Sequence, residues 1–314
     1  MKIVAVESLG ISVENFETLK NEFAEQGHEF KYYMDRREDP ATLINRMQEA
    51  DIVVVSNIPL HEEVLSKCGN LELLSVGFTG LDHIDLDYCK KHNIQVVNAA
   101  GYSTTAVSEL TIALMLDLLR HITSLDGTIR QGQGRGTFLG HELRGKTVGL
   151  VGTGAIGTAT ARLLVAFGCR VLAFNRTCHL DAEALGVTYV DLPTLMRHSD
   201  IVSLHVPLTP ETHHLISANM LALMKPTALL VNTARGNVVD ITALTQTLKE
   251  GRIAGAAVDV YEQEPPLPSS HPLLQAPNCI CVPHIGFATH EAFNIRAGIV
   301  FSTVKKHLGM QNNY

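Results

Sequence analysis

The sequence predicts an α/β protein made of two doubly wound domains, each with a parallel sheet. Three observations support this prediction. The chain has 314 residues, which is more than one ordinary core needs and favours two domains. Short apolar runs alternate with stretches of helical periodicity along most of the chain, as in parallel sheets that helices cover on both faces. A glycine-rich turn at residues 151–157 separates one such run from a helical stretch.

The first series of strands and helices runs to about residue 98. The apolar runs MKIVAV, ADIVVVS and LELLSVG are expected to be strands, at residues 1–6, 50–56 and 71–77. The segment 13–27 between the first two carries apolar residues at helical spacing. A long helix is expected over 104–122, because Ser103 and Thr104 suit its N-terminus.

A glycine-rich connector over 127–145 leads to a second series of strands and helices, from KTVGLVGTG to CICVPHIG. The segment 291–308 is expected to be helical. Because the first series otherwise lacks a cover, we expect this helix to return to it. The predicted domains are therefore residues 1–100 with 289–314, and residues 101–288.

Composition excludes several classes of protein. The net charge is −7, with 46% hydrophobic and 18% charged residues, which is typical of a soluble enzyme and not of a nucleic-acid or membrane-surface binder. The opening MKIVAVESLG lacks the apolar core of a signal peptide, and LTIALMLDLL is too short to span a bilayer.

The six cysteines form no CxxC motif. Cys279 and Cys281 alternate with Ile280 and are expected on one side of a strand. Reduced thiols in a cytoplasmic protein are favoured over a disulfide or a metal site. His213 and His214 are expected to be exposed loop residues, and no metal site is predicted.

The run VGLVGTGAIG predicts a dinucleotide-binding turn. Gly152 permits the tight turn, Gly154 lets the backbone approach a pyrophosphate, and Gly157 lets helix and strand pack closely. The first helical amides, at Ala155 and Ile156, then face the phosphates together with the positive end of the helix dipole. The alternatives are a structural glycine turn or another nucleotide-like ligand.

The strand RVLAF should end in an acid that binds the ribose 2′-hydroxyl, but the next residue is Asn175. A neutral amide does not repel a 2′-phosphate, Arg176 can pair with one, and Thr177 can donate a hydroxyl. The stretch favours NADP(H) without excluding NAD(H). The alternative is a solvated polar strand end.

Four further motifs carry a specific resemblance: SVGFTGLDHID (75–85), LLVNTARGNVVD (229–240), GAAVDVYEQEPP (255–266) and PNCICVPHIGFAT (277–289). Together with the glycine turn, the chain resembles the D-isomer-specific 2-hydroxyacid dehydrogenase family along nearly its whole length. The resemblance implies a Rossmann cofactor domain inserted in a flavodoxin-like substrate domain, and a reversible hydride transfer between a nicotinamide cofactor and a small 2-hydroxy or 2-keto acid.

The resemblance implies a catalytic set of Arg235, Glu264 and His284. His284 would protonate the new alkoxide, because imidazole titrates near neutrality. Glu264 would favour the imidazolium and orient the ring. Arg235 would hold the substrate carboxylate and polarise the carbonyl. Each residue taken alone could instead be structural.

The resemblance also implies contacts to the cofactor and the substrate. Asp259 would contact the nicotinamide carboxamide, and the backbone at Val76 and Gly77 would bind the substrate carboxylate, with Phe78 shaping the pocket. Further cofactor contacts are expected from a covering loop and from a strand end beneath the nicotinamide: His205, Val206 and Pro207, and Thr233 and Ala234.

The loops SNIPLHEEV, SVGFTGL and AAGYSTTA carry no Arg or Lys, so a small unphosphorylated acid of the glyoxylate–hydroxypyruvate type is expected. The family resemblance implies a homodimer formed through residues 105–145.

A different class of function remains open: a dinucleotide-sensing binding protein on the same fold, like the corepressors that resemble this family.

Overall fold

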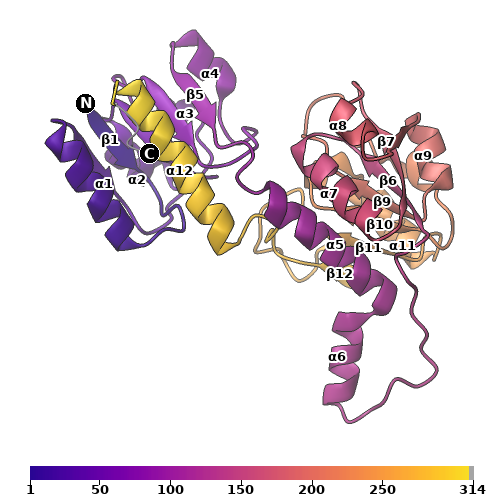
Figure 1. Ribbon diagram of the computed structural model, residues 1–314. Coiled ribbons are helices and arrows are strands. Elements are labelled where there is room, and N and C mark those ends of the chain that lie inside the picture. The colour runs from indigo at the N-terminus through magenta and orange to yellow at the C-terminus, as the bar shows by residue number, and fades with distance from the viewer. Residues whose placement is uncertain (311–314) are drawn as a thin grey trace. The chain divides into compact units, whose positions relative to one another are not determined.

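The structure is a computed structural model that describes residues 1–310. The chain divides into two compact units (Figure 1). Unit 1 comprises Met1–Ser103 and the segment from Ala288 onward, and unit 2 comprises Thr104–Phe287. The divisions predicted from the sequence fall after residues 100 and 288.

Unit 1 contains a five-stranded parallel sheet in the order β2-β1-β3-β4-β5. This is the flavodoxin-like order, which reverses direction between β1 and β3. The strands are β1 (Lys2–Ala5), β2 (Glu29–Tyr32), β3 (Ile52–Val55), β4 (Leu73–Val76) and β5 (Gln95–Asn98). The helices are α1 (Val13–Glu25), α2 (Pro40–Met47), α3 (Glu62–Leu65), α4 (Leu86–Lys91) and α12 (His290–His307).

The helix expected over 291–308 is α12, and it lies on the sheet of unit 1 beside α1 (yellow and indigo in Figure 1). The Ser75 hydroxyl of β4 donates to the Val300 carbonyl of α12 at 3.1 Å. Phe301 of α12 packs edge-on against Phe16 of α1 and Phe30 of β2. These aromatic contacts form the core on this face of the sheet.

Unit 2 contains a seven-stranded parallel sheet in the order β12-β11-β10-β9-β6-β7-β8. Its direction reverses between β6 and β9, as in a Rossmann domain. The strands are β6 (Thr147–Val151), β7 (Arg170–Phe174), β8 (Thr188–Tyr189), β9 (Ile201–Leu204), β10 (Leu229–Asn232), β11 (Gly255–Val258) and β12 (Cys279–Cys281). The helices are α5 (Thr104–Arg120), α6 (Ile122–Arg130), α7 (Ala155–Ala166), α8 (Leu180–Glu183), α9 (Leu192–His198), α10 (Ala218–Leu221) and α11 (Ile241–Lys249), with short 3₁₀ turns at Gly236–Val238 and Pro272–Gln275.

The long helix expected over 104–122 is interrupted. His121 adopts a left-handed backbone conformation with φ of 53°, which ends α5 and starts α6. The first residues of the predicted connector, 127–130, are therefore helical. An Asp126–Arg130 ion pair of 2.7 Å supports this last turn. None of the side chains of α6 is buried.

No helix within residues 1–310 combines the length and the apolar character needed to cross a membrane.

Candidate active site

The glycine turn after β6 has the geometry that its sequence predicts. Gly152 has φ of 104°, and a Cβ there would lie 2.7 Å from the His205 carbonyl oxygen. A Cβ on Gly157 would lie 2.2 Å from the Gly152 carbonyl oxygen, so only glycine lets α7 approach the strand. By contrast, a Cβ on Gly154 would meet nothing within 4 Å. The open space beside Gly154, at the N-terminus of α7, fits a pyrophosphate.

The polar end of β7 lies next to this turn, because the Gly152 amide donates to the Phe174 carbonyl at 2.8 Å. The Asn175 side-chain amide donates to the Thr177 carbonyl at 2.7 Å, which fixes the local turn. Arg176 and Thr177 are exposed. The pKa of Glu211 is lowered by the Thr209 hydroxyl and, to a smaller extent, by the charge of Arg176. Arg176 therefore lies close enough to Glu211 for the two charges to interact.

The segment 205–207 follows β9, on the other side of the point where the strand order reverses. The His205 amide donates to the Val151 carbonyl at 2.8 Å, which places this segment beside the glycine turn. Burial lowers the pKa of His205 to about 4, so its ring is neutral near neutral pH. Its Nε2 lies 3.0 Å from the Ser203 hydroxyl. The neutral state of this ring was not predicted from the sequence.

Arg235 follows β10 in a turn that Asn232 shapes. The buried Asn232 side chain donates to the Arg235 carbonyl at 2.9 Å and accepts the Ala234 amide at 3.0 Å. The Thr233 hydroxyl lies 3.0 Å from that of Thr111 in α5. A Cβ on Gly236 would lie 2.0 Å from the Tyr261 carbonyl carbon, so the loops after β10 and β11 pass very close to each other.

His284 and Glu264 are brought together, although twenty residues separate them. His284 Nδ1 lies 2.8 Å from Oε2 and 2.9 Å from Oε1 of Glu264. The His284 side chain is 11% exposed and that of Glu264 is 60% exposed. The ring also meets Phe287 edge-on, with centroids 5.3 Å apart. The pair can therefore orient an imidazole that exchanges a proton through Nε2.

Asp259 holds the turn that carries His284. Its Oδ1 accepts the Ile285 amide at 2.6 Å and its Oδ2 accepts the Gly286 amide at 2.8 Å. His284 itself has φ of 53°. Burial raises the pKa of Asp259, while the two amides and the nearby His284 oppose that rise. Each carboxylate oxygen has a second lone pair, so the predicted carboxamide contact remains compatible with these bonds.

The strands that lead into these residues explain why they gather. β12, β11 and β10 are neighbours, and their carboxyl ends carry His284, Asp259 and Arg235. β9, β6 and β7 continue the same edge with the residues expected to bind the cofactor. Open α/β sheets bind ligands outside this edge.

The substrate-binding residues predicted in unit 1 lie at the end of β4. The Gly77 amide donates to the Val55 carbonyl at 2.7 Å, so a carboxylate bound at this loop would share that donor or use neighbouring amides. A Cβ on Gly77 would lie 3.2 Å from the Leu9 side chain and 3.5 Å from Arg296 Cδ. The tighter of these two contacts is with Leu9, and the distance to Arg296 is an ordinary van der Waals contact. The glycine therefore admits the Leu9 side chain, whereas the prediction from the sequence explained it by the approach of a ligand. Phe78 is buried, 6.5 Å from the Tyr102 ring.

The loops at this edge carry no Arg or Lys, but one basic residue reaches the edge from another segment of unit 1. Arg36 reaches it from the segment after β2, and its Nη1 donates to Asn57 Oδ1 at 2.6 Å and to Glu7 Oε2 at 3.0 Å. Loop sequences could not show this contact, because twenty-one residues separate Arg36 from Asn57. Glu38 also pairs with Arg36, at 2.7 Å. Glu7 and Glu38 therefore compensate the positive charge of Arg36.

Sequence reasoning also missed two buried charges, Glu7 and Arg296, which are 4% and 3% exposed. A signal for Arg296 was present, because it occupies the apolar stripe of α12 with Ala292, Val300 and Val304 at four-residue spacing. Burial raises the pKa of Glu7, and Arg36 and the Ser56 and Ile58 amides oppose this rise.

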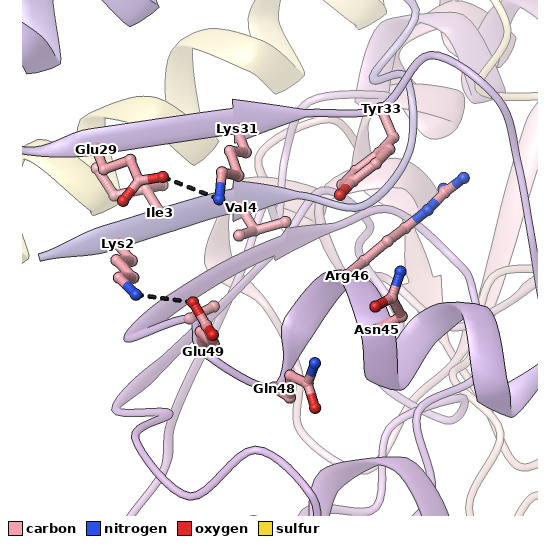
Figure 2. Close-up of a pocket in the computed structure, with 11 residues that line it drawn as sticks. Lys2, Ile3, Val4, Glu29, Lys31, Tyr33, Asn45, Arg46, Gln48 and Glu49 are labelled. Atoms are coloured by element: carbon pink, nitrogen blue, oxygen red, sulfur yellow. Dashed lines mark hydrogen bonds and ion pairs between the residues drawn. The ribbon is translucent and has the colours of Figure 1, made fainter.

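A hollow of about 320 Å³ lies elsewhere on unit 1, along β1, β2 and α2 (Figure 2). Lys2 pairs with Glu49 at 2.8 Å and Lys31 with Glu29 at 2.9 Å across its wall. None of the residues that line it is a predicted site residue. The lysines that line the hollow already pair with acidic residues, so the hollow is poorly suited to bind an anionic substrate.

Comparison with known proteins agrees with this geometry. Residues 112–286 match the family model described as "D-isomer specific 2-hydroxyacid dehydrogenase, NAD binding domain". A glyoxylate reductase from Thermofilum pendens is 44% identical over 273 residues, which are 84% of this chain and 79% of that protein.

Two solved structures share the fold. An acyclic imino acid reductase in complex with NADPH and D-Arg has a TM-score of 0.88 and 30% identity, covering 98% of this chain and 97% of that one. The D-lactate dehydrogenase from Aquifex aeolicus, complexed with NAD and lactic acid, has a TM-score of 0.85 and 32% identity, covering 98% of this chain and 96% of that one.

These similarities favour an enzyme over a dinucleotide-sensing binding protein, since the relatives named above are oxidoreductases. Unit 2 is a Rossmann-type domain that binds a nicotinamide dinucleotide. The chain belongs to the D-isomer-specific 2-hydroxyacid dehydrogenase family and is an oxidoreductase that interconverts 2-hydroxy and 2-keto acids.

Proposed function

We propose that this enzyme reduces a small, unphosphorylated 2-keto acid of the glyoxylate–hydroxypyruvate type and prefers NADPH to NADH. The observation that carries the proposal is the His284–Glu264 pair, with Nδ1 2.8 Å from the carboxylate, on a turn at the carboxyl edge of the dinucleotide-binding sheet. The name of the Thermofilum pendens relative supports the substrate class.

The proposed roles combine the family resemblance with the contacts of the residues. Bound NADPH supplies a hydride to the keto carbon. His284 donates a proton from Nε2 to the keto oxygen, because its Nδ1 faces Glu264. Arg235 binds the substrate carboxylate with its guanidinium. Asp259 keeps His284 in place through the two amides that follow it.

We propose an unphosphorylated substrate because the arginines at the carboxyl edge of the unit 1 sheet already have partners within the protein. Arg36 is met by Glu7 and Glu38, and Arg296 donates to protein groups. A phosphate would need cations that are not already paired. The proposed carboxylate site remains the backbone at Val76, Gly77 and Phe78.

The test is a set of steady-state rates for glyoxylate, hydroxypyruvate, pyruvate and longer keto acids, each with NADH and NADPH. The absorbance of the reduced nicotinamide reports turnover. The proposal expects the highest kcat/KM for a two- or three-carbon acid with NADPH. No turnover with any keto acid would overturn it.

The preference for NADPH is proposed from Asn175, which stands where an acid would bind the ribose, and from the exposed Arg176 beside it. The open space beside Gly154 suits the pyrophosphate of either dinucleotide.

A homodimer through residues 105–145 is also proposed. Ile122, Ile129 and Leu139 are 57%, 64% and 80% exposed, and α6 extends from α5 away from the sheet of unit 2 (Figure 1). Large exposed apolar side chains in one segment are typical of an interaction surface. Light scattering should give twice the chain mass for the wild type, and Ile129→Glu should lower it.

A cytoplasmic location is proposed on the cysteines. All six have free thiols, including Cys279 and Cys281, whose sulfurs lie 3.7 Å apart on one side of β12. Free thiols are typical of a reducing compartment.

A further inference from the structure

A buried charged network lies at the carboxyl edge of the unit 1 sheet, and the reaction proposed above does not use it. Glu7 follows β1 and Ser56 follows β3, the neighbouring strands between which the strand order reverses. Ligands of open α/β sheets bind outside such a point. Burying the Glu7 carboxylate and the Arg296 guanidinium here is unfavourable unless each is compensated by partners. Their contacts therefore indicate what they hold in place.

Arg296 reaches three separate loops from α12. Its Nη2 donates to the Leu9 carbonyl at 2.5 Å, and its Nη1 donates to the Ser56 hydroxyl at 3.0 Å. The same Nη1 lies 3.5 Å from the Gly77 carbonyl oxygen, and the Ser56 hydroxyl lies 3.4 Å from it. The two donors therefore face the same carbonyl group from the buried side.

The Gly77 carbonyl belongs to the peptide that also contains the Phe78 amide. This peptide bond is trans, so the Phe78 N–H points away from the side on which Arg296 lies. A cation beside the carbonyl oxygen polarises the peptide and makes its N–H a stronger donor. Arg296 thus acts on the substrate-binding loop through the backbone, without touching the substrate.

Glu7 anchors the loop that carries Ser56. Its Oε1 accepts the Ser56 amide at 2.8 Å and the Ile58 amide at 3.4 Å, and its Oε2 accepts from Arg36 at 3.0 Å. It also places a negative charge close enough to act on Arg296. Ser56 is therefore held by its backbone on one side and presents its hydroxyl to Arg296 and Gly77 on the other.

We infer that Arg296 is a positioning residue for the substrate carboxylate, because with Ser56 it orients and polarises the Gly77–Phe78 peptide. The inference rests on the proposed function, in which the backbone at residues 76–78 binds that carboxylate. It predicts that Arg296 sets the affinity for the substrate and leaves the affinity for the dinucleotide alone.

The test compares Arg296→Met, Arg296→Lys and Ser56→Ala with a control, Arg46→Met. Like Arg296, Arg46 is an arginine of unit 1 with a buried side chain, which is 7% exposed. It donates to the Val6 and Asp35 carbonyls at 2.8 and 3.1 Å and lies over the Tyr33 ring. It therefore controls for the loss of any buried arginine. The readouts are kcat and KM for glyoxylate, Kd for NADPH from fluorescence, and Tm.

Arg296→Met should raise the KM for glyoxylate about tenfold, the loss expected when a charge-assisted interaction is removed. Its kcat and its Kd for NADPH should stay within about twofold of wild type, since the carboxylate contact is weakened equally in the ground state and the transition state. Arg296→Lys, which keeps the charge, should restore part of the affinity. Arg46→Met should lower Tm and leave KM unchanged. A KM for Arg296→Met no higher than that of Arg46→Met overturns the inference.

If Arg296→Met does not fold, the Ser56→Ala variant tests the inference in its place. It removes the hydroxyl between Arg296 and Gly77 and retains the buried guanidinium. A selective rise in the KM for glyoxylate at unchanged Tm supports the inference, and an unchanged KM overturns it.

Calorimetry with oxalate, in the presence of NADP⁺, separates this inference from the proposed function. Oxalate is a two-carbon carboxylate that the enzyme does not reduce, so its Kd needs no turnover. Weaker oxalate binding to Arg296→Met than to wild type and Arg46→Met supports the positioning role even if the wild type reduces no keto acid. Equal binding to all three proteins overturns it.

Discussion

His284 and Glu264 share one hydrogen-bonding contact, in which Nδ1 of the ring lies 2.8 Å from one carboxylate oxygen and 2.9 Å from the other. Glu264 accepts the proton on Nδ1, so proton exchange with a substrate is left to Nε2. The ring is thereby fixed at two points: this contact, and the backbone turn that Asp259 holds.

Replacing His284 by Gln should lower kcat for keto-acid reduction by about 10² or more, the usual contribution of general acid catalysis. Gln fills the same place but cannot supply the proton. Binding of the dinucleotide, followed by fluorescence, should be nearly unchanged. His213→Gln is the control, because His213 lies exposed in a loop of the same unit. A His284→Gln enzyme with the kcat of wild type would contradict the assignment.

Glu264→Gln should lower kcat less than His284→Gln does. The Gln carbonyl can still accept the proton on Nδ1, so the ring orientation is largely kept, but the charge-assisted hydrogen bond is replaced by a weaker neutral one. Steady-state kcat for the two variants, measured side by side, gives the order. The idea fails if Glu264→Gln is the more damaged of the two.

Asp259→Asn should destabilise unit 2 by about 1–3 kcal/mol, because Asn offers one acceptor and one donor group to two N–H donors. The turn that carries His284 should loosen, so kcat should fall as well. Chemical unfolding measures the first effect. Asp240→Asn is the matched control, since within residues 1–310 Asp240 accepts only the Ala243 amide at an N-cap, where Asn serves equally well. Equal stability of the two variants would show that Asp259 does not hold the turn.

The wild type should prefer NADPH to NADH in kcat/KM. Arg176→Ala should remove a charge-assisted contact to the 2′-phosphate, worth about 1.5–3 kcal/mol, and leave NADH nearly unaffected. Asn175→Asp should penalise NADPH and favour NADH, because the new carboxylate repels the phosphate and can bind the ribose hydroxyls.

Arg197→Ala, at an exposed arginine in α9, controls for a general loss of positive charge. Glu211 lies close enough for Arg176 to lower its pKa, so Glu211→Gln should release Arg176 and strengthen NADPH binding. A tenfold or larger preference of the wild type for NADH would refute the interpretation of Asn175 and Arg176.

The stability of unit 2 should fall as the pH drops from about 6.5 towards 4, because of His205. Burial lowers the pKa of His205 from 6.5 to about 4 in the folded protein. In this window the unfolded chain binds a proton that the folded chain does not, so acid favours unfolding, by at most about 1.4 kcal/mol per pH unit. Unfolding at several pH values should show a shallower dependence for His205→Asn than for wild type. His213→Gln should keep the wild-type slope.

The sequence was most informative where a local pattern has one physical cause. The structural roles predicted for Gly152 and Gly157 are confirmed, because a Cβ would clash with the His205 carbonyl at the first and with the Gly152 carbonyl at the second. The alternating strands and helices likewise predicted both parallel sheets. In contrast, His121 broke the long helix through a backbone conformation that no residue pattern announced.

The contacts of Arg36, Glu7 and Arg296 in unit 1 were not predicted, for a different reason. Arg36 meets Glu7 across 29 residues and Arg296 meets Ser56 across 240 residues, and only the strand order brings their loops to one edge. The composition of the loops at this edge therefore could not reveal Arg36 and Arg296, which reach the edge from distant segments of the chain. Arg296 was nevertheless detectable in principle, as a charge on an apolar helical stripe.

Because unit 1 is split by unit 2, the two units cannot be completed in the order in which their first residues leave the ribosome. The strands of unit 1 are all synthesised by residue 98, but α12, whose buried Val300, Phe301 and Val304 cover that sheet, follows only after Ala288. Unit 2 is continuous from Thr104 to Phe287, so all of its core is available first. During synthesis the earlier unit must keep an apolar face exposed while the later one folds, and that interval is when the chain is most prone to aggregate.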